Sequence, residues 1–177
     1  MTRSLALLGL VVLSLSGSRT WATNGSPTHA RPPATITIRS LGDTVVKMAL
    51  AKGVSPDDAA QSMKLRANLL NMHLVAELPL SRQVSAITGK PSPYATIFQF
   101  CDVLTAREML DYSLDFAAYL PCRIALVEDD KGQGWLVMMN LDMLLNLADL
   151  KPELKAKAIE VRDKLENIMR AGANGDL

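Results

Sequence analysis

The sequence is poor in the residue types on which most recognisable catalytic sites depend. Its 177 residues include only two cysteines and two histidines, and aromatic residues make up 5% of the chain. It contains no Cys-x-x-Cys pair, no phosphate-binding glycine loop, no nucleophile elbow and no zinc-protease signature. The sequence thus gives no motif-based evidence for thiol–disulfide exchange, phosphate binding, nucleophile-elbow hydrolysis or zinc-dependent proteolysis. The sequence therefore neither predicts nor excludes an enzyme.

An excess of charge of one sign is also missing. Lysine and arginine total 19 against 18 aspartate and glutamate residues, which gives a formal net charge of +1. The basic residues between Lys155 and Lys164 alternate with acidic ones, as on a solvated helix face. Nucleic acid and anionic membranes normally need clustered basic residues, so neither is expected as a main partner.

Long hydrophobic runs are absent beyond the N-terminus. The run Leu5–Leu15 follows a basic start at Arg3, and its roughly 11 residues are too few for a membrane-spanning helix, which needs about 20. Small residues follow, ending at Thr20-Trp21-Ala22. This pattern predicts a signal peptide over residues 1–22 and a soluble, exported protein in the periplasm or outside the cell. No stable membrane span is expected after cleavage.

The rest of the chain is predicted to form one domain behind a short linker. Residues 23–34 are rich in proline and polar residues and are predicted to be a flexible tether. Residues 35–172 are expected to form a single domain, and residues 173–177 a disordered tail.

Alternating strand and helix patterns predict an α+β domain. Its expected form is a small, mostly antiparallel sheet of three to five strands, with helices packed on at least one face. Strands are predicted at Thr35–Arg39, within Asp43–Ala51, and at His73–Ala76, Ala95–Cys101, Cys122–Glu128 and Trp135–Met139. Helices are predicted from Ser55 to Met72, over Ser81–Thr88, from a capping box at Thr105 to Leu114, over Leu141–Leu150, and from Pro152 to Gly172.

The last two predicted strands form a hairpin around Asp129–Gly134, and both are almost continuously apolar. Such strands are buried on both faces, or on one face and in a subunit interface. The pattern therefore predicts a homodimer that associates through a face or an edge of the sheet.

Three segments carry a resemblance to a known family. They are Asn68-Leu-Leu-Asn-Met-His-Leu-Val75, Ile97-Phe-Gln-Phe-Cys-Asp102, and the hairpin that begins at Tyr119-Leu-Pro-Cys-Arg123. Together they resemble the bacterial domain-of-unknown-function family 302, in particular a branch of exported members with two cysteines. The resemblance implies a compact α+β fold, frequent dimerisation and a bacterial envelope setting. It implies no particular activity.

Both cysteines lie in this region, and three interpretations of them remain open. A disulfide between Cys101 and Cys122 requires that their strands run antiparallel, because a parallel crossover would place them at opposite ends of the sheet. A reactive thiol at Cys122 would draw on the positive charge of the adjacent Arg123. Cys101, Cys122 and His73 form a possible soft-metal or haem site.

These observations favour an exported binding or accessory domain. Its partner would be a small-molecule ligand or another periplasmic protein, and no cofactor is predicted. The alternative is a thiol-based redox or sulfur-handling protein that uses Cys122 and Cys101, with Arg123 as a further candidate catalytic residue.

Overall fold

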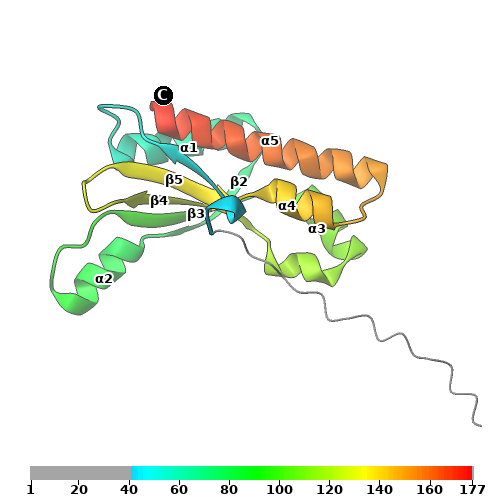
Figure 1. Cartoon of the computed structure of the whole chain (residues 1–177), viewed down its shortest axis with the longest axis horizontal. Coiled ribbons are helices and arrows are strands. Elements are labelled where there is room, and N and C mark those ends of the chain that lie inside the picture. Colours follow the sequence, from blue (N-terminus) through cyan, green and yellow to red (C-terminus); the bar gives the residue numbers. More distant parts are fainter. Residues whose placement is uncertain (1–40, 177) are drawn as a thin grey trace, which may run out of the picture. The chain divides into compact units, whose positions relative to one another are not determined.

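A five-stranded antiparallel sheet organises residues 41–176, the part of the chain that the computed structural model describes (Figure 1). The strand order is β1-β5-β4-β3-β2. The strands are β1 (Val45–Ala49), β2 (His73–Leu78), β3 (Ala95–Cys101), β4 (Cys122–Glu128) and β5 (Gly134–Met139). The helices are α1 (Pro56–Leu69), α2 (Leu80–Thr88), α3 (Val103–Tyr112), α4 (Leu141–Leu147) and α5 (Pro152–Asn174), with short 3-10 turns η1 (Leu41–Thr44) and η2 (Leu114–Ala118). The predicted α+β class is confirmed.

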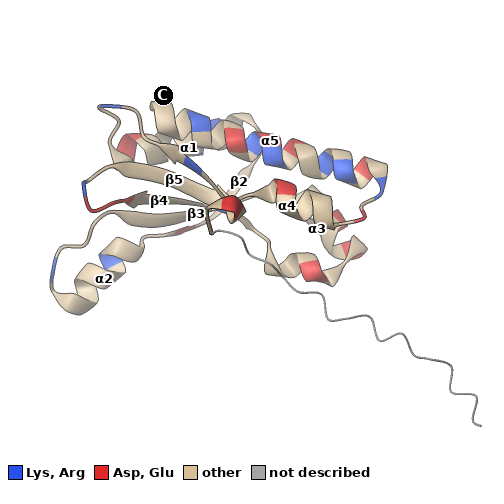
Figure 2. Ribbon diagram, viewed as in Figure 1, with Lys and Arg blue, Asp and Glu red and all other residues tan. Residues whose placement is uncertain are grey.

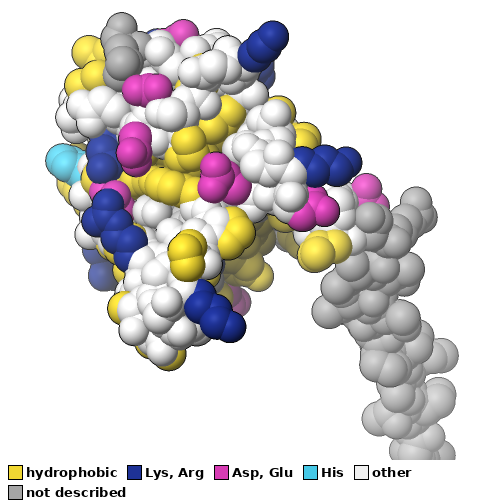
Figure 3. Space-filling model, turned by 90° about the vertical axis from the view of Figure 1, so that its left-hand side faces the viewer, with side chains coloured by type: hydrophobic (Ala, Val, Ile, Leu, Met, Phe, Trp, Pro, Cys, Tyr) yellow, Lys and Arg dark blue, Asp and Glu magenta, His cyan; other side chains and the backbone are white. Residues whose placement is uncertain are grey.

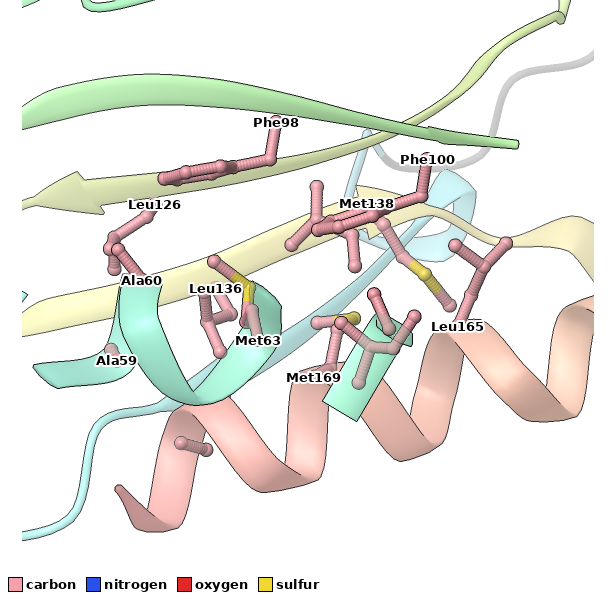
Figure 4. Close-up of a cluster of buried hydrophobic side chains, with 14 of the residues drawn as sticks. Ala59, Ala60, Met63, Phe98, Phe100, Leu126, Leu136, Met138, Leu165 and Met169 are labelled. Carbon is pink, nitrogen blue, oxygen red and sulfur yellow. The ribbon is translucent and has the colours of Figure 1, made fainter. Parts of the chain in front are cut away.

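One face of the sheet is covered by α1 and α5 and holds the main hydrophobic core (Figure 4). Alternate residues of β3 and β4 point to this face, so Phe98, Phe100, Ile124 and Leu126 are buried. Methionines and leucines of the two helices, such as Met63, fill the space between the layers.

On the opposite face, called here the open face, no helix of residues 41–176 lies across the centre (Figure 1). One row of its side chains crosses all five strands in the order Lys47, Val137, Ala125, Ile97 and Leu78. None of these side chains is fully buried, although three central ones are apolar. The apolar character of β4 and β5 thus serves a helix-covered core on one side and a half-exposed surface on the other.

Helix α1 begins as the sequence predicts. Ser55 accepts a hydrogen bond from the backbone N–H of Asp58, and the Asp58 carboxylate accepts from the backbone N–H of Ser55. Pro56 occupies the first helical position, where its missing N–H has no cost. The small helix predicted over Ser81–Thr88 is also present, as α2.

Several predicted helix boundaries differ from the structure. Helix α1 ends at Leu69 rather than at Met72, and helix α4 ends at Leu147 rather than at Leu150. Helix α3 is capped by Asp102, which accepts from the backbone N–H of Thr105, so the helix begins one turn before the predicted capping box. Helix α5 does not end at Gly172 but continues to Asn174, and Gly175 takes the left-handed conformation that closes it. The predicted tail, residues 173–177, therefore begins inside this helix, and Ala173 is buried.

Gly172 has a packing role instead. A Cβ atom at this position would lie 2.6 Å from Met63 Cγ and 3.2 Å from the backbone oxygen of Ala59. The absence of a side chain thus lets α5 approach α1 closely, which is a common reason for glycine inside a helix.

Other expectations lie beyond the described residues. The signal peptide, the tether and the strand predicted at Thr35–Arg39 all fall in residues 1–40. None of the described helices is both long and apolar enough to cross a membrane.

Candidate functional site

An open groove of about 510 Å³ lies at the end of the sheet where β4 begins and β5 ends. The open face contributes Ile97, Ala125 and Val137, and α4 contributes Leu144 and Leu147. The volume falls within the range of roughly 300–1,000 Å³ that is typical of small-molecule sites. Its lining is predominantly apolar, as in most such sites.

Arg123 is the single charged residue among the described residues that line the groove. Strand register places it opposite Gln99 of β3, on the open face of the sheet. Within the described part of the chain, its guanidinium makes neither an ion pair nor a hydrogen bond. An exposed arginine beside an apolar surface retains five N–H donors for an incoming acceptor. Figure 2 shows that charged residues otherwise concentrate on the helices and turns rather than on the visible strands.

A second, smaller cavity of about 80 Å³, called here the inner pocket, lies behind the end of the sheet. Helix α3 contributes Ala106 and Met109, and Phe116 of η2 and Ala158 of α5 complete its apolar wall. The carboxylate of Asp102 stands at its border.

The groove and the inner pocket share four lining residues, Tyr119, Cys122, Leu141 and Leu144, called here the neck. The two cavities therefore adjoin at the first residue of β4. The groove has room for a broad apolar part of a ligand, and the inner pocket has room for a slender one.

Both cysteines are free and partly buried, and both line the inner pocket. Strands β3 and β4 are antiparallel, with Phe100 opposite Cys122, so Cys101 is the next residue along from the partner of Cys122. The topological condition for the predicted disulfide is thus met, while the bond itself is not present in the structure.

The thiols are poor nucleophiles in this setting. Burial, followed by the proximity of Cys101, raises the pKa of Cys122 to about 11, and Arg123 only partly opposes the shift. Burial and the neighbouring Asp102 carboxylate raise the pKa of Cys101 as well. The predicted activation of Cys122 by Arg123 is therefore outweighed by desolvation.

Asp102 is held in its charged form. Partial burial acts to raise its pKa, but hydrogen bonds from Thr105 and the Lys164 ammonium 3.5 Å away outweigh burial, so the pKa is lowered. The border of the inner pocket therefore holds a carboxylate paired with Lys164, whereas the groove holds the unpaired positive charge of Arg123.

His73 is brought near one of the two cysteines. It is the register partner of Cys101 across β2 and β3, whereas Cys122 lies on the next strand and opposite Phe100. No group of three or more His, Cys, Asp or Glu side chains in residues 41–176 is arranged to hold a metal ion. The described residues thus bring His73 and Cys101 together, and the soft-metal or haem interpretation stays a prediction.

A third hollow, between α1 and α2, is polar. Its volume is about 810 Å³, and Lys64, Glu77, Arg82 and Glu128 line it together with several serines. Lys64 and Glu77 pair with each other at 2.6 Å, and Glu128 accepts a hydrogen bond from the backbone N–H of Tyr94. Three of these four charged groups are therefore engaged within the protein, whereas Arg82 makes neither an ion pair nor a hydrogen bond with the described residues.

Comparison with known proteins identifies the family. The family model described as "Domain of unknown function DUF302" matches residues 46–172. This chain belongs to the DUF302 family. A crystal structure of a DUF302 protein from Bacillus stearothermophilus is similar, with a TM-score of 0.60 at 15% sequence identity, covering 72% of this chain and 97% of that one. At this identity the likeness supports the fold alone. No curated protein matches the chain.

The sequence indicated part of this site. Cys101, Cys122 and Arg123 were identified as candidates, and the structure places all three around the adjoining cavities. The contribution of α4 to the groove was missed, since its leucines resemble ordinary core residues. The exposure of Leu147, 81%, reveals that this helix also presents apolar side chains outside the core.

Proposed function

We propose that this DUF302 domain is exported and binds a predominantly apolar small molecule in the groove beside Arg123. The observation that carries the proposal is the combination of a sizeable apolar groove and an unpaired arginine at one end of the open face. Ligand sites in proteins typically combine an apolar lining with a few orienting polar groups. The signal peptide predicted over residues 1–22 supports a location in the periplasm or outside the cell, and N-terminal sequencing of the periplasmic fraction tests it.

Binding is tested with the neutral apolar dye N-phenylnaphthylamine, whose fluorescence rises in apolar surroundings. We expect micromolar binding by the full mature protein. In the Ala125→Phe variant the larger side chain occupies part of the groove, so less of the groove lining remains to contact the dye. We expect this variant to bind the dye about tenfold more weakly, or weaker still.

Ala95→Phe is the matched control. Ala95 lies on the open face in the neighbouring strand but does not line the groove, so this variant should bind the dye like the unmodified protein. Equal binding by all three proteins, or no dye binding at all, would contradict the proposal.

The second part of the proposal is a homodimer. Helix α2 has no buried residue, and Leu80, Val84 and Ile87, which share one face, remain 47%, 38% and 85% exposed. Figure 3 faces this end of the molecule and shows hydrophobic side chains at the surface among charged ones. An amphipathic helix whose apolar side chains remain exposed is a typical element of a subunit interface. We therefore assign α2 to contacts with a second copy, away from the groove.

Light scattering at micromolar concentration tests this assembly. We expect the mass of a dimer for the mature protein and the mass of a monomer for Ile87→Glu, because the variant buries an unpaired carboxylate in the interface. Ala86→Glu introduces the same charge at an exposed position that is not three or four residues from Leu80, Val84 or Ile87, and it serves as the control. A monomeric mass for the unmodified protein would refute the dimer.

A thiol-based redox or sulfur-handling role is the second candidate. It is favoured by the position of two free thiols against one pocket. The raised pKa values mean that exchange with disulfides would be slow at neutral pH. This role is distinguished from ligand binding by the oxidation experiment described in the Discussion.

A further inference from the structure

We infer that the ligand is a single-chain amphiphile with an anionic head group, bound with its head at Arg123 and its tail directed past Cys122 into the inner pocket. This inference rests on the proposed function and specifies the chemical class of the ligand. It follows from the distribution of charge around the two cavities and from the way in which they adjoin.

The head group is defined by Arg123. Its guanidinium is the single charge among the described residues that line the groove, and no carboxylate of the described chain pairs with it. The nearest acidic residue of α4, Asp142, is engaged with Arg162 instead. A carboxylate head satisfies the planar N–H donors of arginine better than a neutral or cationic head does.

The direction of the tail is defined by the inner pocket. The pocket adjoins the groove only through shared apolar neck residues, including Tyr119 and Cys122. The inner pocket has no Lys or Arg among its described lining residues, and its one carboxylate, Asp102, is paired with Lys164, so it offers no unpaired cation to an anionic head. Met109 and Phe116 provide apolar contacts for a chain. The inner pocket has a volume of only about 80 Å³, which favours a slender, unbranched tail.

Head-group selectivity is measured by calorimetry with dodecanoate, dodecanol and dodecyltrimethylammonium, each below its micelle concentration and at low salt. We expect dodecanoate to bind about tenfold more tightly than dodecanol, and the ammonium compound to bind weakest. Arg123→Gln should lower the ratio of dodecanoate affinity to dodecanol affinity from about ten to about one. Lys47→Gln, which removes an open-face cation outside the groove, should leave the preference intact.

Tail placement is measured with a series of carboxylates from octanoate to hexadecanoate. Each methylene that enters the inner pocket should strengthen binding by up to about fourfold. Ala106→Leu narrows the inner pocket without touching the groove, so affinity should stop rising at a shorter chain length. If this variant does not fold, Ala158→Leu, at a second residue that lines the inner pocket but not the groove, should shorten the preferred chain in the same way.

The outcomes separate the two proposals. Equal affinity for the three head groups, together with binding of the neutral dye, overturns the anionic amphiphile while the apolar binding site survives. An unchanged chain-length optimum in both pocket variants overturns the assigned path of the tail. Absence of binding by the dye and by all amphiphiles overturns the proposed function itself.

Discussion

Replacement of Phe98 by alanine is expected to lower the free energy of unfolding by about 3–5 kcal/mol. The side chain is completely buried between the sheet and the helices that cover it. Its ring stacks against Phe100 with centroids 6.5 Å apart, and the Lys64 ammonium lies 5.5 Å from its centroid. The variant therefore loses apolar burial, an aromatic pair and a cation–π contact, and it leaves a cavity in a closely packed layer.

Urea denaturation of the mature protein measures this loss. Leu69→Ala serves as the control, since Leu69 is 78% exposed at the end of α1 and its truncation should change stability by at most about 0.5 kcal/mol. A loss below about 1 kcal/mol for Phe98→Ala would mean that this core is not packed as described. Phe98 also lies next to the groove in sequence. Its neighbour Ile97 points to the opposite face of the sheet and lines the groove.

The sequence was sufficient for the elements whose signals are local. The cap at Ser55, the hairpin around Asp129–Gly134 and the alternation of Ala95–Cys101 each depend on residues close together in the chain, and each element is present. The prediction that α5 ends at Gly172 was wrong because glycine can either end a helix or allow two helices to pack closely. Its role is fixed by the close approach of α1, more than a hundred residues earlier in the chain, and no local pattern records such a contact.

The candidate site shows the same division. The pair Cys122-Arg123 was identifiable from its composition, but its meaning depends on which strand lies beside β4 and on which face remains uncovered. Burial reverses the effect that the adjacent arginine would have on the Cys122 thiol, and burial is a property of the fold. The groove joins residues of β3, β4, β5 and α4, so no single segment predicts it.

Oxidation is expected to join Cys101 and Cys122 and to raise the free energy of unfolding by up to about 3 kcal/mol, because the bond closes a loop of roughly 20 residues. The antiparallel pairing of β3 and β4 places the two residues at neighbouring strand ends, and both thiols border the inner pocket. With oxidised glutathione, each protein thiol loses one hydrogen as the sulfur–sulfur bond forms, and the reagent is reduced to two glutathione thiols.

The rate of that oxidation should depend steeply on pH. With the pKa of Cys122 raised to about 11, the thiolate of this residue is only about one part in ten thousand at pH 7. If Cys122 is the attacking thiol, the rate should rise about tenfold per pH unit and level off near the pKa.

Intact mass after alkylation, recorded over time with and without reductant, measures the rate, and urea denaturation of the oxidised form measures the stability gain. The Cys101→Ala and Cys122→Ala variants should each lose both the mass shift of two hydrogens and the gain in stability. If the oxidised protein instead carries glutathione on one cysteine or forms intermolecular disulfides, the two thiols do not approach each other and the redox role as a dithiol pair is excluded.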